Sequence, residues 1–258
     1  MILDDILAET RRTVARAKEV RPLAIVQAEA AAVPAPRGFA AALQRPDIAC
    51  IAEFKRRSPS AGWIREGAEP GPIVLAYEEA GAAALSVLTD GPFFGGSLVD
   101  LARAREAVPL PALRKDFMVD PYQVPEARAA GADAILLIVA ALTDAELAAL
   151  LDEASRWKLD VLVEAHDAAE VDRAVALGAR IIGVNHRDLR TFKMDMTLTE
   201  RLRDRIPADR LLVAESGIRT ADDVQRMRNV GVDAILVGES LMRGADPNAA
   251  LRALLERP

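Results

Sequence analysis

The sequence predicts an α/β protein, a single-domain (β/α)8 barrel of the TIM type with an N-terminal helical extension. Two observations lead to this prediction. Short apolar runs alternate with helical patterns through most of the 258 residues, and eight such runs can be counted. Apolar strands that alternate with helices form a parallel sheet that is covered on both faces. Eight strand–helix units in about 250 residues match a closed barrel.

Four of the apolar runs belong to a sequence pattern that recurs at a regular interval. In each, a helical pattern ends at a glycine and an apolar run follows, as in AGAAALSVLT and AGADAILLIV. Glycine is the usual residue after a helix C-terminus, because it adopts positive φ without a steric cost. The copies recur roughly every 50 residues, about twice the length of one strand–helix unit. The four segments are residues 80–89, 130–139, 177–185 and 230–238.

The other four strands are expected before and between these segments. Helical patterns such as TDAELAALLDEASRWK separate the strands. An open, doubly wound sheet is the structural alternative. It would usually carry a glycine-rich dinucleotide turn after its first strand, and FKRRSPSAG is not such a turn. The four runs are residues 48–55, 111–117, 159–166 and 211–217.

The two ends of the chain are expected to belong to the same domain, residues 1–258. Residues 1–47 precede the first strand and predict one or two extra helices over the bottom or side of the barrel. Residues 48–243 form the predicted barrel core, and residues 244–258 predict a C-terminal helix.

Composition argues against several classes of function. The net charge is −6 and no basic tract is long, which argues against a nucleic-acid partner. A single cysteine, Cys50, excludes an intrachain disulfide framework and fits a reducing compartment. No apolar run approaches membrane-spanning length, and the N-terminus lacks the apolar core of a signal peptide. We therefore expect a cytoplasmic protein without a membrane partner, present as a monomer or weak homodimer.

Polar side chains gather where the predicted strands end. Glu53 and Lys55 close the first strand two residues apart, so they point to the same side. In barrels of this kind the chemistry lies at the C-terminal ends of the strands. A buried unpaired charge is costly, so these groups must pair with each other or with a ligand. A single charged residue of this kind could equally belong to a structural salt bridge. Acids and bases at the ends of at least five strands indicate a functional site instead. The residues are Glu53, Lys55, Lys115, Glu164, Asn185, Arg187 and Glu215.

The last two strands add a signal for phosphate. Both AESGIRT and VGESLMRG place small residues where a strand passes into a helix. Gly217 and Gly238 let backbone N–H groups approach an anion, and Ser216 and Ser240 add hydroxyl groups. Together with a helix N-terminus they predict a phosphate cradle, at the position usual for such barrels. Each glycine–serine pair alone could be an ordinary helix cap.

Several motifs, in this order, closely resemble the indole-3-glycerol-phosphate synthase family of tryptophan biosynthesis. They are IAEFKRRSPSAG, SVLTDGPFFGGS, LRKDFMVDPYQVPEARAAGADAILLI, LVEAHD, IIGVNHRDL, AESGIRTADDV and VGESLMR, and the match runs from about Ile48 to Arg243. The resemblance implies a lyase that closes 1-(2-carboxyphenylamino)-1-deoxyribulose 5-phosphate to an indole, with loss of carbon dioxide and water. That substrate supplies its own electron sink, so no cofactor and no metal are expected.

The resemblance also implies roles for five catalytic candidates. Lys115 resembles the general acid at the ribulose carbonyl, and Glu164 resembles the proton-transfer carboxylate of the later steps. Glu53 and Asn185 would hold hydroxyl and amino groups of the substrate and support Lys115. Lys55 would bind the substrate carboxylate or phosphate. Whether it also acts as a general acid together with Lys115 stays open.

Further residues are expected to contact the substrate. Four of them match the apolar wall of the family, although each would otherwise be read as a core residue. The segment RRSPSAGWI is expected to be a mobile loop that closes over the ligand. The expected substrate contacts are Ser58, Phe94, Phe117, Leu137, Arg187, Leu189 and Glu215, and the expected phosphate contacts are Ser216, Gly217, Gly238 and Ser240.

The two histidines receive no catalytic role. Strand parity turns His186 away from the cavity. His166 follows Glu164 by two residues and could enter the rim, but a capping or solvated position is favoured. Two histidines and one cysteine make a transition-metal site improbable.

Two other functions stay open. Phosphoribosylanthranilate isomerase, another phosphosugar barrel enzyme, needs a thiol or carboxylate base in the cavity, and Cys50 comes too early in its strand to serve. A non-catalytic phosphosugar-binding barrel would be expected to have lost Lys115 or Glu164. Both residues are present, which favours the enzyme.

Overall fold

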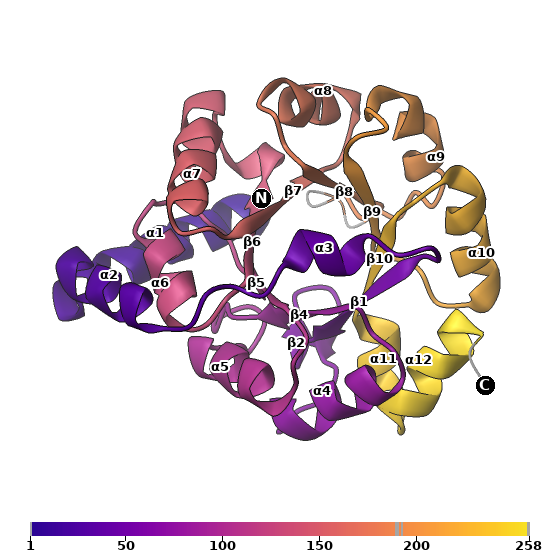
Figure 1. The fold of residues 1–258 in the computed structure, drawn as a ribbon, viewed down its shortest axis with the longest axis horizontal. Helices are drawn as coiled ribbons and strands as arrows, with labels where there is room; N and C mark the ends of the chain where they lie inside the picture. Colours follow the sequence, from indigo (N-terminus) through magenta and orange to yellow (C-terminus); the bar gives the residue numbers. More distant parts are fainter. Residues whose placement is uncertain (1, 189–190, 192, 257–258) are drawn as a thin grey trace.

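The computed structural model describes residues 2–188, 191 and 193–256, and it confirms the closed barrel (Figure 1). Eight parallel strands form a ring in the order β1-β10-β9-β8-β7-β6-β5-β4, and β1 pairs with both β4 and β10. All eight predicted strands are present. They are β1 (Ala49–Phe54), β4 (Ala84–Leu88), β5 (Ala112–Lys115), β6 (Ala134–Ile138), β7 (Asp160–Ala165), β8 (Ile181–Asn185), β9 (Leu211–Glu215) and β10 (Ala234–Val237).

Helices surround the ring of strands (Figure 1). Several begin at a side chain that accepts a backbone N–H group, as Thr143 and Thr220 do in their capping boxes. The helices are α4 (Pro70–Glu79), α5 (Leu98–Ala107), α6 (Gln123–Ala129), α7 (Asp144–Arg156), α8 (Ala168–Ala176), α9 (Leu198–Leu202), α10 (Ala221–Val230), α11 (Glu239–Arg243) and the C-terminal α12 (Pro247–Leu255), with 3-10 turns η1 (Val139–Ala141) and η2 (Arg203–Arg205).

The strands are buried on both faces, which explains why their sequences are nearly continuous apolar runs. In β6, Ile135 and Leu137 pack in the layer between barrel and helices. Ala134, Leu136 and Ile138 alternate with them and face the barrel interior. The same alternation turns the charged residues at the strand ends inward.

The N-terminal extension differs from its prediction. It contains three helices, α1 (Ile2–Val20), α2 (Leu23–Ala32) and α3 (Phe39–Leu43). The short α3 crosses the N-terminal end of the barrel, where Phe39 and Leu43 join the interior cluster (Figure 1). Helix α2 packs against α6.

Helix α1 reaches the opposite end of the barrel, which the sequence prediction did not foresee. Its residues Ile2, Leu3 and Ile6 line the cavity at the C-terminal ends of the strands. The placement over the bottom or side is therefore wrong for α1. The apolar face of a helix predicts that the helix packs, but it carries no information about which end of the barrel receives it.

A short hairpin follows β1, in the segment that the sequence predicts as a loop. Its strands are β2 (Arg57–Ser58) and β3 (Gly62–Trp63), which pair antiparallel. Among the described residues, no helix is both long and apolar enough to cross a bilayer.

Candidate active site

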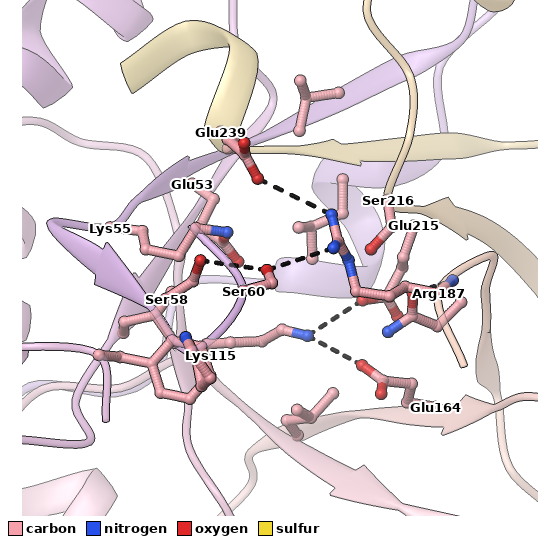
Figure 2. A pocket seen from close by; sticks show the side chains of 18 of the residues that line it. Glu53, Lys55, Ser58, Ser60, Lys115, Glu164, Arg187, Glu215, Ser216 and Glu239 are labelled. Atoms are coloured by element: carbon pink, nitrogen blue, oxygen red, sulfur yellow. Dashed lines mark hydrogen bonds and ion pairs between the residues drawn. The ribbon is translucent and has the colours of Figure 1, made fainter. Parts of the chain in front are cut away.

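The carboxyl ends of the strands surround a cavity, and most of the predicted site residues line it (Figure 2). The five catalytic candidates come from β1, β5, β7 and β8 or from the residue that follows β1. The predicted residues in the wall are Glu53, Lys55, Ser58, Phe94, Lys115, Phe117, Glu164, Asn185, Arg187, Glu215, Ser216, Gly217, Gly238 and Ser240.

Lys115 lies between two buried carboxylates (Figure 2). Its Nζ donates to Glu164 Oε2 at 2.9 Å and to Glu215 Oε2 at 3.1 Å. Burial disfavours the charged ammonium, but the nearby carboxylates outweigh burial and raise the pKa of Lys115 above its ordinary value. The lysine is therefore a cation held in place at the centre of the cavity.

The two carboxylates beside Lys115 differ in their electrostatics. Burial raises the pKa of Glu215 to about 8, and the neighbouring Glu164 adds to this shift. Burial acts on Glu164 in the same way, but Lys115 and His166 outweigh it and hold the pKa of Glu164 well below its usual range. Near neutral pH, Glu164 is therefore ionised while Glu215 largely keeps a proton.

A second ion pair lies at the end of β1. Lys55 Nζ is 2.7 Å from Glu53 Oε1, and Glu53 Oε2 accepts from the hydroxyl of Ser86 at 3.3 Å. Glu53 is almost fully buried, so it needs these partners. The acid and the base that end the first strand share one cavity, as strand parity predicts.

Two glycines leave the space that these carboxylates occupy. A Cβ atom at Gly183 would overlap Oε1 of Glu215, and a Cβ atom at Gly238 would overlap the side chain of Glu53. Glycine is needed here for close approach rather than for its φ angle.

We expect Gly183→Ala to lower kcat/KM by about 10²-fold, because the added methyl group displaces Glu215 from Lys115. Steady-state kinetics with thermal unfolding in parallel would measure the effect. Gly71→Ala is the matched control, since a Cβ atom there meets no neighbour within 4 Å. A folded Gly183→Ala variant with normal kcat/KM would show that the position of Glu215 does not matter.

The apolar part of the wall contains Phe94 and Phe117, whose ring centroids are 6.0 Å apart. The prediction for Leu137 is wrong, because this side chain points into the layer between strand and helices. Its neighbours Leu136 and Ile138 line the cavity instead. The predicted contact Leu189 lies outside the residues that the structure describes.

Arg187 links two sides of the rim (Figure 2). Its Nη1 donates to the hydroxyl of Ser60 at 3.3 Å, and its guanidinium lies 3.7 Å from Glu239 Oε2. Ser58 and Ser60 are 3.4 Å apart through their hydroxyl oxygens. Arg187, the second residue after β8, thus connects the hairpin after β1 with the start of α11.

The four residues of the predicted phosphate cradle line the cavity. Ser216 and Gly217 both have positive φ, of 66° and 80°, and Ser216 is one of few residues other than glycine with this conformation. His186 points away from the cavity, as predicted, and its Nδ1 lies 2.9 Å from the carbonyl oxygen of Ser216. Burial lowers the pKa of His186, so a neutral ring with its proton on Nδ1 donates to that carbonyl.

His166 lies beside Glu164 and not in the capping or solvated position that the sequence favours. Only 11% of its side chain is exposed, and its Nε2 lies 3.2 Å from Oε1 of Glu164. The sequence showed the spacing of two residues between Glu164 and His166, which puts both on one side of the chain, but not the depth of burial.

Several wall residues were missed by the sequence prediction. Those on α1 come from a helix that was expected elsewhere, and the others were not singled out, although six of them lie inside the quoted motifs RRSPSAGWI, AESGIRT and VGESLMRG. They are Ile2, Leu3, Ile6, Pro59, Ser60, Leu88, Asp116, Leu136, Ile138, Ile218, Arg219, Leu236, Val237 and Glu239. Across the part of the chain that the structure describes, no group of three or more His, Cys, Asp and Glu side chains is arranged to hold a metal ion.

A closed barrel with buried lysine–carboxylate pairs at the C-terminal ends of its strands defines a barrel enzyme of the acid–base type. Comparison with known families then gives the particular one. The family model described as "Indole-3-glycerol phosphate synthase" matches residues 3–254, and the chain belongs to this family.

Curated relatives agree with the family. The chain is 51% identical over 254 residues to "Indole-3-glycerol phosphate synthase 2" of Streptomyces coelicolor, covering 98% of both chains. It is 52% identical over 259 residues to "Indole-3-glycerol phosphate synthase" of Rhodospirillum rubrum, again covering 98% of both.

Similarity to solved structures, at 16% and 17% identity, bears only on the fold of this chain and not on its function. A 3-hexulose-6-phosphate synthase has a TM-score of 0.62 at 16% identity, covering 80% of this chain and 98% of the other. A thiamine phosphate pyrophosphorylase from Pyrococcus furiosus has a TM-score of 0.59 at 17% identity, covering 81% and 94%.

Proposed function

We propose that this chain closes 1-(2-carboxyphenylamino)-1-deoxyribulose 5-phosphate to indole-3-glycerol phosphate, releasing carbon dioxide and water, in tryptophan biosynthesis. The observation that carries the proposal is the Lys115 ammonium, held by Glu164 and Glu215 in a cavity with an aromatic wall. The membership of the chain in the family supports the reaction, and the roles of single residues are argued below from their contacts.

Lys115 is the proposed acid for ring closure. An ammonium group has three N–H donors, and Glu164 and Glu215 each accept one of them. The third is available to the ribulose carbonyl oxygen. As the aromatic carbon forms its bond to the carbonyl carbon, negative charge develops on that oxygen, and the nearby cation stabilises it. The oxygen takes a proton and becomes a hydroxyl group.

Ring closure prepares the loss of carbon dioxide. The bond from the ring to the carboxylate breaks, and its electron pair returns to the ring and neutralises the iminium. Lys55, which pairs with Glu53, would hold the substrate carboxylate or phosphate. The carboxylate of Glu53 would accept hydrogen bonds from hydroxyl and amino groups of the substrate. The side-chain amide of Asn185 would both accept hydrogen bonds from these groups and donate to them.

Glu164 is the proposed base of the dehydration. The hydroxyl group formed from the carbonyl leaves as water, and a proton leaves the neighbouring carbon to complete the indole double bond. Since Glu164 is ionised near neutral pH, it can accept that proton directly. The protonated Glu215, with a pKa raised to about 8, is a candidate donor for the departing hydroxyl.

The isomerase alternative loses support from the position of Cys50. Its side chain is almost fully buried in the layer between strands and helices, away from the cavity. The test of the proposed function is to mix purified protein with the substrate and to follow indole fluorescence and carbon dioxide release together. If neither product forms while the isomerase substrate is converted, the proposal fails.

We expect Ser240→Asp to raise KM strongly, with a smaller effect on kcat, because the added carboxylate repels the substrate phosphate at the cradle. Ser240 lines the cavity next to Gly238 and Gly217. Substrate kinetics and competition by inorganic phosphate would measure the change. Ser155→Asp, on the exposed outer side of α7, adds the same charge as a control. Unchanged phosphate affinity in Ser240→Asp would mean that the phosphate binds elsewhere.

A further inference from the structure

A histidine and a second glutamate extend the charged groups of the cavity toward the surface. His166 follows β7, and Glu170 lies in the first turn of α8. The Nε2 of His166 is 3.2 Å from Glu164 Oε1, and its Nδ1 is 3.1 Å from Glu170 Oε2. The lysine therefore contacts one oxygen of Glu164 and the imidazole contacts the other.

The contacts of the ring indicate that His166 is a cation. Both ring nitrogens face carboxylate oxygens, which accept protons and cannot donate them when ionised. Glu170 Oε2 also accepts the backbone N–H of His166 at 2.8 Å, which fixes the ring against the start of α8. Burial favours the neutral ring, but the two carboxylates outweigh it and raise the pKa of His166 to about 10.

Glu164 has a neighbour that Glu215 lacks, while Glu215 in turn lies beside the charge of Glu164. Both are almost fully buried, and both accept from Lys115. Only Glu164 also contacts an imidazole, and only Glu164 has a lowered pKa. The charged groups that face His166 are Glu164 on β7 and Glu170 on α8, with Lys115 and Glu215 beyond Glu164.

We propose that His166, oriented by Glu170, is a positioning residue that holds Glu164 in its ionised form with Oε2 turned toward Lys115 and the substrate. The inference rests on the proposed function, in which Glu164 is the base of the dehydration. The 3.2 Å approach acts chiefly through charge, because the ring N–H is not aligned on the carboxylate as in a regular hydrogen bond. His166 touches Glu164 and is not assigned a contact with the substrate.

The kinetic test replaces the cation. His166→Asn keeps an N–H group near Glu170 and removes the charge beside Glu164. We expect kcat to fall about tenfold to 10²-fold, as for a misplaced catalytic group, with KM little changed. The acid limb of the kcat–pH profile should move to higher pH, because Glu164 loses one of its two cations. His166→Lys restores a cation and should recover part of both changes.

Two variants of α8 complete the series. Glu170→Gln removes the carboxylate that favours the imidazolium, so the pKa of His166 falls and the alkaline limb of kcat should move to lower pH. Asp172→Asn is the matched control, since Asp172 is exposed and pairs with Arg205 on the outer surface. It should leave kcat and the pH profile unchanged. A His166→Asn variant with normal kcat and an unshifted acid limb would overturn the proposal.

A spectroscopic test does not depend on activity. The chain has two histidines, so 15N-histidine labelling gives two sets of imidazole signals. We expect His166 to be doubly protonated near neutral pH and His186 to be neutral, and Glu164→Gln to shift only His166. A neutral His166, or a His166 whose imidazole signals do not shift in Glu164→Gln, would overturn the proposal. A wild-type protein that forms no indole would instead overturn the proposed function, and these signals would still decide whether His166 holds Glu164.

Discussion

Lys115→Met is expected to lower kcat and kcat/KM together by about 10²–10⁴-fold, the usual loss for a general acid. Methionine keeps the bulk of the side chain and removes the charge and the proton. Because the interaction with the carbonyl oxygen strengthens only as the bond forms, the loss falls on the transition state rather than on binding. Carbon dioxide release and indole fluorescence should slow to the same extent, since both follow ring closure.

The Lys115→Met variant is expected to stay folded, because Glu215 is already largely protonated and Glu164 keeps His166 as a partner. Glu215 already has a pKa of about 8. Lys158→Met, at an exposed position after α7, is the control for the loss of a lysine. A near-normal kcat in Lys115→Met would exclude Lys115 as the acid, and Lys55 would then be the better candidate.

The charged residues of the site could be predicted because strand geometry decides their direction. A residue two positions from another in a strand lies on the same face. Glu53 and Lys55 therefore had to meet in the same cavity, and the inward direction of Lys115, Glu164 and Glu215 followed from the same rule. Their exact partners did not follow, because the pairing of Lys115 with two carboxylates depends on how the strands are staggered around the ring.

Residues that reach the cavity by other routes could not be predicted. Ile6 comes from a helix whose apolar face would fit either end of the barrel. Leu137 was assigned to the wall from the resemblance alone, and the alternation of β6 puts Leu136 and Ile138 there. His166 looked like a capping residue, and its partner Glu170 is supplied by the start of the following helix.

Glu164→Gln is expected to lower kcat by about 10²–10⁴-fold, as for the loss of a general base, but at a later step than Lys115→Met. The amide keeps the shape of the carboxylate and cannot accept the proton released in the dehydration. Lys115 remains present to serve ring closure. In a single turnover, carbon dioxide should therefore appear at close to the normal rate while indole fluorescence lags behind.

The order of the two products decides this prediction. Rapid mixing with parallel detection of carbon dioxide and indole would compare wild type, Lys115→Met and Glu164→Gln. Glu69→Gln is the control for a change from carboxylate to amide, because Glu69 is exposed, pairs with Arg103 and does not line the cavity. If both products slow equally in Glu164→Gln, Glu164 acts at or before ring closure. If indole forms at the normal rate, the proton of the dehydration goes to another group, and the protonation state of Glu215 makes Glu53 the carboxylate to test next.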